Sequence, residues 1–347
     1  IFLAIKKDME PALLLPIGFG AILVNIPGTS VLTDGDGTGI ISWLYEVGIE
    51  ASEAMPILLF IGIGAMIDFE PLITNPKLMI LGAFAQLGIF VTIILATLLG
   101  FNINDAAAIG IIGAADGPTS ILVALRLGSS YVGPIMVVAY SYMALVPIIQ
   151  PAVIKCCTTK KERLIRMDDN TRHASKSVKI FFPIIITVVS GLIAPKSLSL
   201  IGFLMFGNLI KECGVLGSLA DTAKTTLCNL ITLLLGITIA FRMQADMFLS
   251  WGTLMIMLLG LFAFIFDTVG GVMFAKLMNL FLPKDKKINP MVGGAGISAF
   301  PMSARVIQKM ALKEDNQNHL LMHAMGPNVA GVIGSAIAAG FLLSLFA

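Results

Sequence analysis

The sequence predicts an all-α polytopic membrane protein, and its composition and its apolar runs both point to that class. Hydrophobic residues make up 57% of the 347 residues and charged residues only 13%, where a soluble domain has about 25%. The mean hydropathy is +0.93. A soluble chain this apolar could not cover its surface with polar groups. The composition therefore excludes a disordered chain, a disulfide scaffold and a nucleic-acid-binding domain.

Nine apolar runs can cross a hydrocarbon layer of about 30 Å, some of them with the help of flanking residues. Two further stretches, 103–128 and 288–306, are apolar but interrupted by GAADGPTS (113–120) and GGAGISAFP (293–301). We therefore expect about nine full spans and two broken helices. The nine runs are 10–26, 54–68, 78–100, 131–154, 178–194, 198–210, 225–241, 252–282 and 325–346.

Charged loops set the predicted orientation. Residues 155–179 carry eight Lys or Arg against three acids, whereas residues 27–53 carry five acids and neither Lys nor Arg. By the positive-inside rule the basic loop 155–177 is cytoplasmic and the acidic loop lies outside. This assignment holds only if 103–128 enters from outside and leaves on the same side. By the same reasoning 288–306 re-enters from the cytoplasm, because its far end carries Arg305, Lys309 and Lys313.

The order of the elements predicts an inverted repeat. Residues 1–177 form the first unit, which contains the broken stretch 103–128. Residues 178–197 form a linking helix, and 198–347 form the second unit, which contains the broken stretch 288–306. The first helices of the two units run in opposite directions. Weak symmetry with interrupted helices is typical of secondary transporters, whose ion site lies where the breaks meet.

Asp116 is the sharpest candidate for ion binding. It precedes Gly117-Pro118 in the first break, and Thr119 and Ser120 add hydroxyl groups beside it. A carboxylate at membrane depth is costly unless it is paired, protonated or bound to a cation. Hard oxygen ligands of this kind suit Na⁺ or a transported proton. The alternative is that Asp116 caps the second half-helix, and both roles are compatible.

The second break offers neutral oxygen ligands. Asn289, Ser298 and Ser303 lie in or near it, and Asn328 opens the next helix after Gly326-Pro327. Amide and hydroxyl oxygens can complete a Na⁺ shell without adding charge. Ordinary helix capping is the alternative for each of these residues.

Other polar residues within or near the apolar runs are weaker candidates. Tyr142 and Tyr140 lie in one predicted helix, where a phenol can relay a proton or simply pack. Asp267, inside 252–282, is either a further ionisable group or a water-facing structural carboxylate. His319 and His323 lack a third metal ligand, which favours a solvated helix face.

Three segments carry a family resemblance. GAADGPTSI (113–121), INPMVGGAGISAFPMSARVIQKM (288–310) and MGPNVAGVIGSAIAAG (325–340) closely resemble the β subunit of the biotin-dependent Na⁺-transporting carboxylic acid decarboxylases. These enzymes act on oxaloacetate, glutaconyl-CoA or methylmalonyl-CoA. Similar segments run along essentially the whole chain. Family members carry additional N-terminal sequence, so we expect residues before Ile1.

The resemblance implies a membrane subunit of a decarboxylase Na⁺ pump. A carboxyltransferase α subunit would move CO₂ to biotin, and a biotin carrier protein would bring carboxybiotin to this chain. The chain would decarboxylate carboxybiotin, consuming a proton, and couple this to Na⁺ export. A small single-span membrane subunit is the third expected partner, and a homo-oligomer is left open. The expected location is the bacterial plasma (inner) membrane, with basic loops cytoplasmic.

The resemblance also assigns roles to residues. Asp116, Tyr142 and Ser298 match the family's catalytic aspartate, tyrosine and serine, and Asn289 and Asn328 match its two functional asparagines. The expected Na⁺ ligands are Asp116, Asn289, Ser298 and Asn328. The family fold resembles elevator-type carriers, with a scaffold and a moving core.

Two other functions remain in competition with this one. The first is a passive Na⁺/H⁺ or Na⁺/carboxylate secondary carrier of related fold. The second is a structural membrane anchor, which the polar groups at the two breaks disfavour. The carboxyltransferase recognises the acyl substrate, so the sequence of this chain does not specify that substrate.

Overall fold

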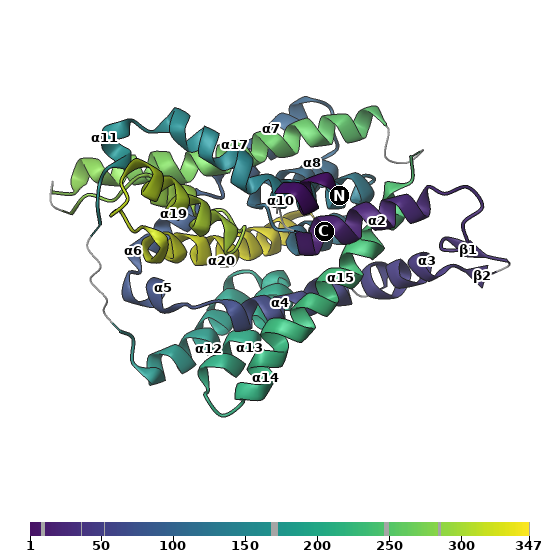
Figure 1. Cartoon of the computed structure of the whole chain (residues 1–347), viewed down its shortest axis with the longest axis horizontal. Helices are drawn as coiled ribbons and strands as arrows, with labels where there is room; N and C mark the ends of the chain where they lie inside the picture. The colour runs from purple at the N-terminus through teal and green to yellow at the C-terminus, as the bar shows by residue number, and fades with distance from the viewer. Residues whose placement is uncertain are drawn as a thin grey trace.

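The computed structural model describes residues 1–7, 11–35, 37–51, 53–167, 173–245, 250–283 and 286–346, and these are mainly helical (Figure 1). Within those ranges the one sheet is an antiparallel hairpin of β1 (Thr33–Asp34) and β2 (Gly37–Thr38). Part of the predicted basic loop, residues 168–172, lies outside the described ranges.

The helices of the first half are α1 (Phe2–Lys7), α2 (Pro11–Val24), α3 (Ile40–Tyr45), η1 (Glu46–Glu50), α4 (Ala54–Met66), α5 (Glu70–Thr74), α6 (Lys77–Phe84), α7 (Leu87–Leu98), α8 (Ile103–Gly110), η2 (Ile111–Ala114), α9 (Gly117–Arg126), α10 (Val132–Cys157) and α11 (Lys160–Arg163). Those of the second half are α12 (Lys176–Ile193), η3 (Pro195–Ser197), α13 (Leu198–Glu212), α14 (Gly217–Asp221), η4 (Thr222–Leu227), α15 (Cys228–Ile239), η5 (Ala240–Met243), α17 (Trp251–Phe281), α18 (Met291–Gly294), α19 (Met302–Glu314) and α20 (Leu321–Phe346).

Six helices among the described residues are long and apolar enough to cross a membrane, and each matches a predicted span. A bent pair, Ile40–Glu50 with Ala54–Met66, would make a seventh span, with an angle of 67° between its arms. The predicted spans 10–26 and 198–210 correspond to helices of 14 and 15 residues. The count of nine stays a prediction. The six helices are Lys77–Leu98, Val132–Cys157, Lys176–Ile193, Gly217–Met243, Trp251–Phe281 and Leu321–Phe346.

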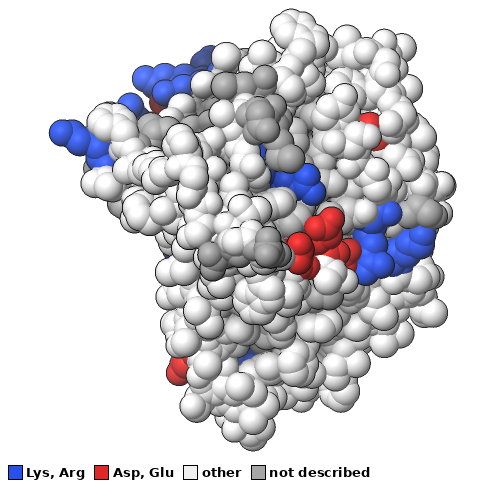
Figure 2. Space-filling model, turned by 90° about the vertical axis from the view of Figure 1, so that its right-hand side faces the viewer, with Lys and Arg blue, Asp and Glu red and all other residues white. Residues whose placement is uncertain are grey.

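The outer surfaces of these helices are apolar. Within α12 only Pro183 and Ser190 are buried, while Leu192 and Ile193 are 80% and 68% exposed. Many other helix residues with large apolar side chains are exposed, among them Leu98, Phe262 and Leu280. On the β1–β2 end of the molecule, which Figure 2 turns toward the viewer, Lys, Arg, Asp and Glu gather in a few patches. An apolar surface of this extent is unfavourable in water and suits contact with lipid. The fold is that of an all-α polytopic membrane protein.

Small residues let helix backbones touch. A Cβ atom on Gly64 of α4 would lie 1.9 Å from the carbonyl oxygen of Leu204 in α13. One on Gly207 of α13 would lie 2.0 Å from the carbonyl oxygen of Ile61 in α4. Because side chains this small expose the backbone, van der Waals packing can hold helices together where the hydrophobic effect is absent.

The helices fall into two groups. Helices α12, α13, α14, α4 and α15 lie in the lower part of Figure 1, and α12 and α4 both pack on α13. Helices α6, α7, α8, α10, α17, α19 and α20 lie in the upper part, where α17 packs on α7 and α10, and α20 packs on α6. Both broken stretches belong to the upper group.

Candidate functional site

The first broken stretch is a helical hairpin. It consists of α8 and η2, a break at Ala115 and Asp116, and then α9. Ala115 adopts the left-handed conformation, with φ of 54°, which ends the first arm. At the base of the hairpin, Asn104 Nδ2 donates to the carbonyl oxygen of Leu127 at 3.1 Å. The two ends of the stretch therefore lie together, as a re-entrant hairpin requires.

The second broken stretch is wedged between two long helices. A Cβ atom on Gly293 of α18 would lie 2.1 Å from the carbonyl oxygen of Gly271 in α17. A Cβ atom on Gly331 of α20 would lie 2.1 Å from the carbonyl oxygen of Gly296. Only glycine allows these close approaches. The GGAG run therefore packs its own backbone directly on α17 and α20, and the chain is non-helical until α19 begins at Met302.

The tips of the two breaks meet. The backbone N–H of Ser298 donates to the carbonyl oxygen of Ala114 at 3.0 Å, and its hydroxyl donates to Oδ2 of Asp116 at 3.2 Å. The Thr119 hydroxyl donates to the same Oδ2 at 2.7 Å, and the Thr119 N–H donates to Oδ1 at 3.3 Å. Asp116 therefore caps α9, as the capping interpretation predicted, and also contacts the other break. Its residue exposure is 6%.

Ser335 of α20 extends this cluster. Its hydroxyl contacts the Ser298 hydroxyl at 3.0 Å and is also within 3.0 Å of the Val332 carbonyl oxygen. Ser335 is fully buried. Its sequence context does not mark it as a site residue, because one serine in the small-residue run GSAIAAG (334–340) resembles a packing residue. Ser335 comes to lie next to Ser298 only because of how α20 packs in the folded protein.

Asn328 lies beside the second break. Its Nδ2 donates to the carbonyl oxygen of Ile297 at 2.8 Å, so the amide holds the residue that precedes Ser298. Its Oδ1 is buried and, among the described residues, has no hydrogen-bond partner. An unpartnered buried amide oxygen is costly. It is the kind of neutral oxygen that a cation could use.

The two tyrosines of α10 have different surroundings. The Tyr140 ring lies against Gly117, where a Cβ atom would come within 2.3 Å of the ring, and its hydroxyl has no partner within the described part of the chain. The Tyr142 hydroxyl donates instead to the carbonyl oxygen of Met257 in α17. Tyr140, rather than Tyr142, packs on the turn that carries Asp116. The catalytic role predicted for Tyr142 is not tested by this geometry.

Asn289 belongs to a separate network. Its Nδ2 donates to the carbonyl oxygens of Arg163 and Ile165, at 2.9 and 2.8 Å, and its Oδ1 accepts from the N–H of Met291. The hydrogen bonds that the structure gives Asn289 include none with Asp116 or Ser298. In this conformation Asn289 fastens the segment 158–167 to the start of α18, and it does not join the other three predicted Na⁺ ligands.

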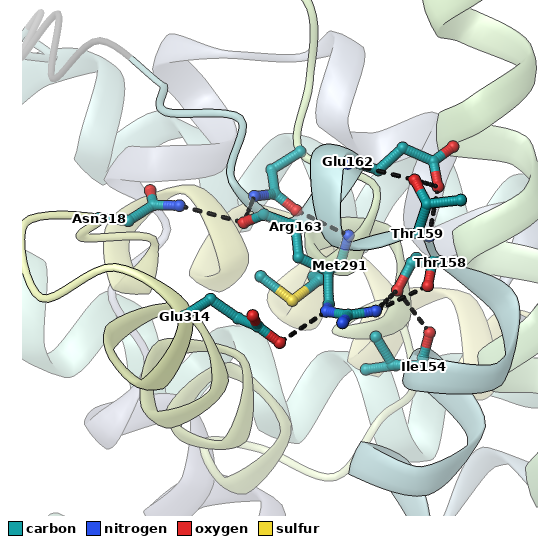
Figure 3. A network of polar contacts seen from close by, with 9 residues as sticks. Ile154, Thr158, Thr159, Glu162, Arg163, Met291, Glu314 and Asn318 are labelled. Atoms are coloured by element: carbon teal, nitrogen blue, oxygen red, sulfur yellow. Dashed lines mark hydrogen bonds and ion pairs between the residues drawn. The ribbon is translucent and has the colours of Figure 1, made fainter.

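Arg163 is the centre of that network (Figure 3). Its Nε donates to Glu314 at 2.8 Å, its Nη1 donates to the Thr158 carbonyl oxygen at 2.7 Å, and its own carbonyl oxygen accepts from Asn318 at 3.3 Å. Nearby, Arg166 donates to Asp315 at 2.7 Å and holds the pKa of that carboxyl below its usual range. The segment therefore ties α10 to Asn289, at the start of the second broken stretch, and to the far end of α19.

Asp267 of α17 is fully buried, so the water-facing alternative for it is wrong. Its Oδ1 accepts from the N–H of Ile89 at 3.2 Å. A Cβ atom on Gly113 would lie 2.4 Å from its Oδ2. The carboxyl group thus lies behind the first break and helps to fix the start of α7.

A cavity of about 320 Å³ opens onto the cluster at the breaks. Asp116, Tyr140 and Ser298 line one side, and Asn229 and Thr232 of α15 line another. The cavity therefore lies between the two helix groups. Among the described residues, Asp116 is the one acid that lines it and Arg305 the one cation. Such a site can bind a small cation at the carboxylate and an anionic group near the guanidinium.

Comparison with known proteins agrees with the motifs at the two breaks. Residues 1–346 match the family described as "Na+-transporting oxaloacetate decarboxylase beta subunit". The chain belongs to this family. The predicted resemblance to these β subunits is confirmed, and the chain is a multi-pass membrane subunit of the Na⁺-transporting decarboxylases.

Individual members of the family cover nearly the whole chain. The methylmalonyl-CoA decarboxylase β subunit of Propionigenium modestum is 48% identical, covering 100% of this chain and 92% of its own length. The glutaconyl-CoA decarboxylase β subunit of Acidaminococcus fermentans is 50% identical, covering 99% and 90%. The oxaloacetate decarboxylase β chain of Klebsiella pneumoniae is 44% identical, covering 99% and 92%. These β subunits differ in the acyl substrate named, so the family does not fix that substrate here.

Proposed function

We propose that this chain decarboxylates carboxybiotin and couples the reaction to Na⁺ export. The observation that carries the proposal is the Ser298–Asp116 hydrogen bond, which joins both breaks at a cavity that the Asp116 carboxylate lines. Membership of the decarboxylase family supplies the reaction class. The carboxybiotin would arrive on a biotin carrier protein, after a carboxyltransferase α subunit has loaded it. A small single-span subunit would complete the complex.

The proposed Na⁺ ligands are Asp116, Ser298 and Asn328, with Asn289 joining after a conformational change. Asp116 supplies the charge, and the hydroxyl of Ser298 can turn its lone pairs toward a cation instead of donating to the carboxylate. Asn328 would offer its unpartnered Oδ1. Asn289 must first release the Arg163 and Ile165 carbonyl oxygens, so its participation requires segment 158–167 to move.

Decarboxylation requires a proton at the ureido nitrogen. Carboxybiotin is a carbamate. When its N–C bond breaks, CO₂ leaves and the electron pair stays on the nitrogen, which takes up the proton. We propose that Ser298 or Tyr142 delivers that proton in a site shielded from water. The proton is replaced from the medium during the cycle, so each turnover consumes one.

Coupling follows from competition at Asp116. One carboxylate cannot hold both a proton and Na⁺, so binding of one favours release of the other. An elevator-type movement of the upper helix group against the lower one would expose the site alternately to the two sides. A ligand drives such a shift only through different affinity for the two states. We propose the plasma membrane as the location, with the basic loops on the cytoplasmic side.

The decisive experiment uses the assembled complex in inverted vesicles. With an acyl substrate present, Na⁺ should accumulate inside the vesicles, and avidin, which sequesters biotin, should abolish the uptake. Uptake that continues in the presence of avidin would favour a passive Na⁺/H⁺ or Na⁺/carboxylate carrier instead. Complexes with an inactive carboxyltransferase provide the matched control, because they lack carboxybiotin for a second, independent reason.

A further inference from the structure

A second concave site lies between α10 and α19. This groove has a volume of about 460 Å³. Its apolar walls come from both helices and consist of Pro147, Pro151, Met302, Val306 and Met310. The other residues that line it are charged, and all but Glu314 are cations, namely Lys155, Arg305, Lys309 and Lys313. We call it the basic groove.

The positive charge of the basic groove is not compensated within the described part of the chain. Arg305, Lys309 and Lys313 follow one another at four-residue spacing, so they share one face of α19, where like charges repel. The ion pairs and hydrogen bonds among the described residues include none from these three side chains or from Lys155. Binding of an anion to these side chains would reduce the repulsion between them.

The acid of the groove is already engaged. Glu314 accepts a hydrogen bond from Arg163, as Figure 3 shows. The contact is 2.8 Å long, and the side chains of Glu314 and Arg163 are largely buried, with 17% and 13% exposed. The charge of Glu314 is therefore already balanced by Arg163, and the cations of the basic groove are left to bind an external anion.

The groove adjoins the cavity at Asp116. Met302 and Arg305 line both spaces, and Met302 is the first residue of α19 after the second break. An anion held by the lysines lies next to the approach to Ser298. The groove therefore has the position of an entry site for the substrate.

We propose that the basic groove is the docking subsite for the carboxylated ring of carboxybiotin before it reaches Ser298. This inference rests on the proposed function. The carboxylate contacts Lys155, Lys309 and Lys313, while the tetrahydrothiophene ring and the alkyl side chain lie on the proline and methionine walls. Electrostatic attraction gathers the ligand and orients its carboxylate, and transfer past Arg305 brings the carbamate to the site of decarboxylation.

The test replaces three lysines together: Lys155→Gln, Lys309→Gln and Lys313→Gln, in the assembled complex without acyl substrate. Free carboxybiotin is added at increasing concentration, and the Na⁺-dependent decarboxylation rate is measured. The half-saturating carboxybiotin concentration should rise about tenfold, since each exposed charge contact contributes a factor of about two or three. The maximal rate and the half-saturating Na⁺ concentration should stay near the wild-type values.

A matched control removes three exposed lysines outside the groove, by Lys160→Gln, Lys161→Gln and Lys286→Gln. An equal rise in half-saturation in this control, or no rise in the groove variant, overturns the proposal. Loss of anionic phospholipid from the purified groove variant, with unchanged carboxybiotin half-saturation, assigns the groove to a lipid headgroup and also overturns it. A wild-type complex that shows no Na⁺-dependent decarboxylation overturns the proposed function instead.

Salt provides an independent readout. In the wild type the half-saturating carboxybiotin concentration should increase with ionic strength, because mobile ions screen exposed charges over about 10 Å at 0.1 M salt. In the groove variant this dependence should be flatter. Lys309→Arg keeps the charge and should behave as wild type. Failure of this variant to retain wild-type half-saturation would show that shape, not charge, governs the groove, and would contradict the proposal.

Discussion

The hydroxyl of Ser298 donates to Oδ2 of Asp116 at 3.2 Å, although 182 residues separate them in sequence. Each residue lies at the tip of a different broken stretch. The carboxylate that caps α9 is therefore also a hydrogen-bond acceptor for the second break. A cation that binds Asp116 must displace the Ser298 hydroxyl or use its oxygen as a ligand. Ion binding therefore changes the contacts of both breaks.

Helices of the two predicted units contact each other reciprocally. Helix α2 packs on α15, and α4 packs on α13, so the first helix of each unit contacts the second helix of the other. The last helix of each unit likewise contacts the third predicted span of the other, because α10 packs on α17 and α20 packs on α6. Reciprocal contacts of this kind are what a two-fold relation between units produces. The inverted repeat and its unit boundaries stay a prediction.

Asp116→Asn should abolish Na⁺-dependent decarboxylation and leave the carboxyltransferase step intact. The amide has the same size but lacks the charge that binds Na⁺, and it cannot accept all the hydrogen bonds that reach the carboxylate. The measurement is CO₂ release against Na⁺ concentration in the assembled complex. Asp221→Asn, which removes an exposed carboxylate on α14, is the control. A normal pumping rate for Asp116→Asn would mean that Asp116 is only a helix cap.

Ser335→Ala should weaken Na⁺ binding without abolishing turnover. The substitution removes the hydroxyl that contacts Ser298 at 3.0 Å, and a buried hydrogen bond contributes about 1 kcal/mol. The half-saturating Na⁺ concentration should therefore rise roughly fivefold. Ser344→Ala, whose hydroxyl donates to the Gly340 carbonyl oxygen farther along α20, should leave it unchanged. Equal effects from both variants would argue against a specific role for Ser335.

The hairpin formed by 103–128 predicts that both of its ends face one side of the membrane. Single cysteines at Ile103 and Ser130, which are exposed, should both react with an impermeant thiol reagent added outside. The four native cysteines are removed first. A cysteine at Lys160 should react only from the cytoplasmic side. Labelling of Ile103→Cys and Ser130→Cys from opposite sides would show that the stretch crosses the membrane.

Gly207→Ala should destabilise the protein in detergent. The new methyl group would lie 2.0 Å from the carbonyl oxygen of Ile61, so α13 and α4 must separate, at a cost of about 1–3 kcal/mol. Gly217→Ala is the matched control, because a Cβ atom there has no neighbour within 4 Å. Thermal unfolding of the purified protein measures the difference. An unchanged midpoint for Gly207→Ala would show that the helices separate easily.

Some of the site could be predicted from the sequence, because its signals are local. Gly, Pro and a carboxylate inside an apolar stretch indicate a break with a functional group, and this reasoning located both Asp116 and Ser298. The resemblance to a known family was specific enough to name the reaction class. None of these signals required knowledge of how helices pack.

The remaining features depend on tertiary contacts. Tyr140 and Tyr142 are two residues apart, so they point to different sides of α10. Because that helix is apolar on all sides, its pattern does not reveal which side faces Asp116. Asn289 lies at the start of the second broken stretch, as a site residue would. Its Nδ2 nevertheless donates to two carbonyl oxygens of segment 158–167. No local pattern signals a contact between segments so far apart in the chain.

The last prediction concerns the competition between Na⁺ and the proton. Asp116 is the one acid that lines the cavity within the described part of the chain, and its proposed partners Ser298 and Asn328 are neutral. Because protonation removes the charge that binds Na⁺, the apparent Na⁺ affinity should weaken as the pH falls and recover as it rises. One proton exchanged for one Na⁺ gives a loss of about tenfold per pH unit in the range where the carboxyl is protonated. The measurement is the initial decarboxylation rate against Na⁺ concentration at several pH values.

Ser298→Ala tests whether the pH dependence comes from the charge of Asp116 or from the neighbouring hydroxyl group. The hydroxyl adds no charge, so its removal should lower turnover while the pH dependence of Na⁺ half-saturation keeps the wild-type slope. Asp116→Glu keeps the carboxylate and should retain the slope even if its longer side chain weakens Na⁺ binding. A wild-type half-saturation that stays flat between about pH 5 and 8 would mean that the two cations bind at separate sites. The shared carboxylate would then have to be replaced by a mechanism in which another group, such as the buried carboxyl of Asp267, carries the proton.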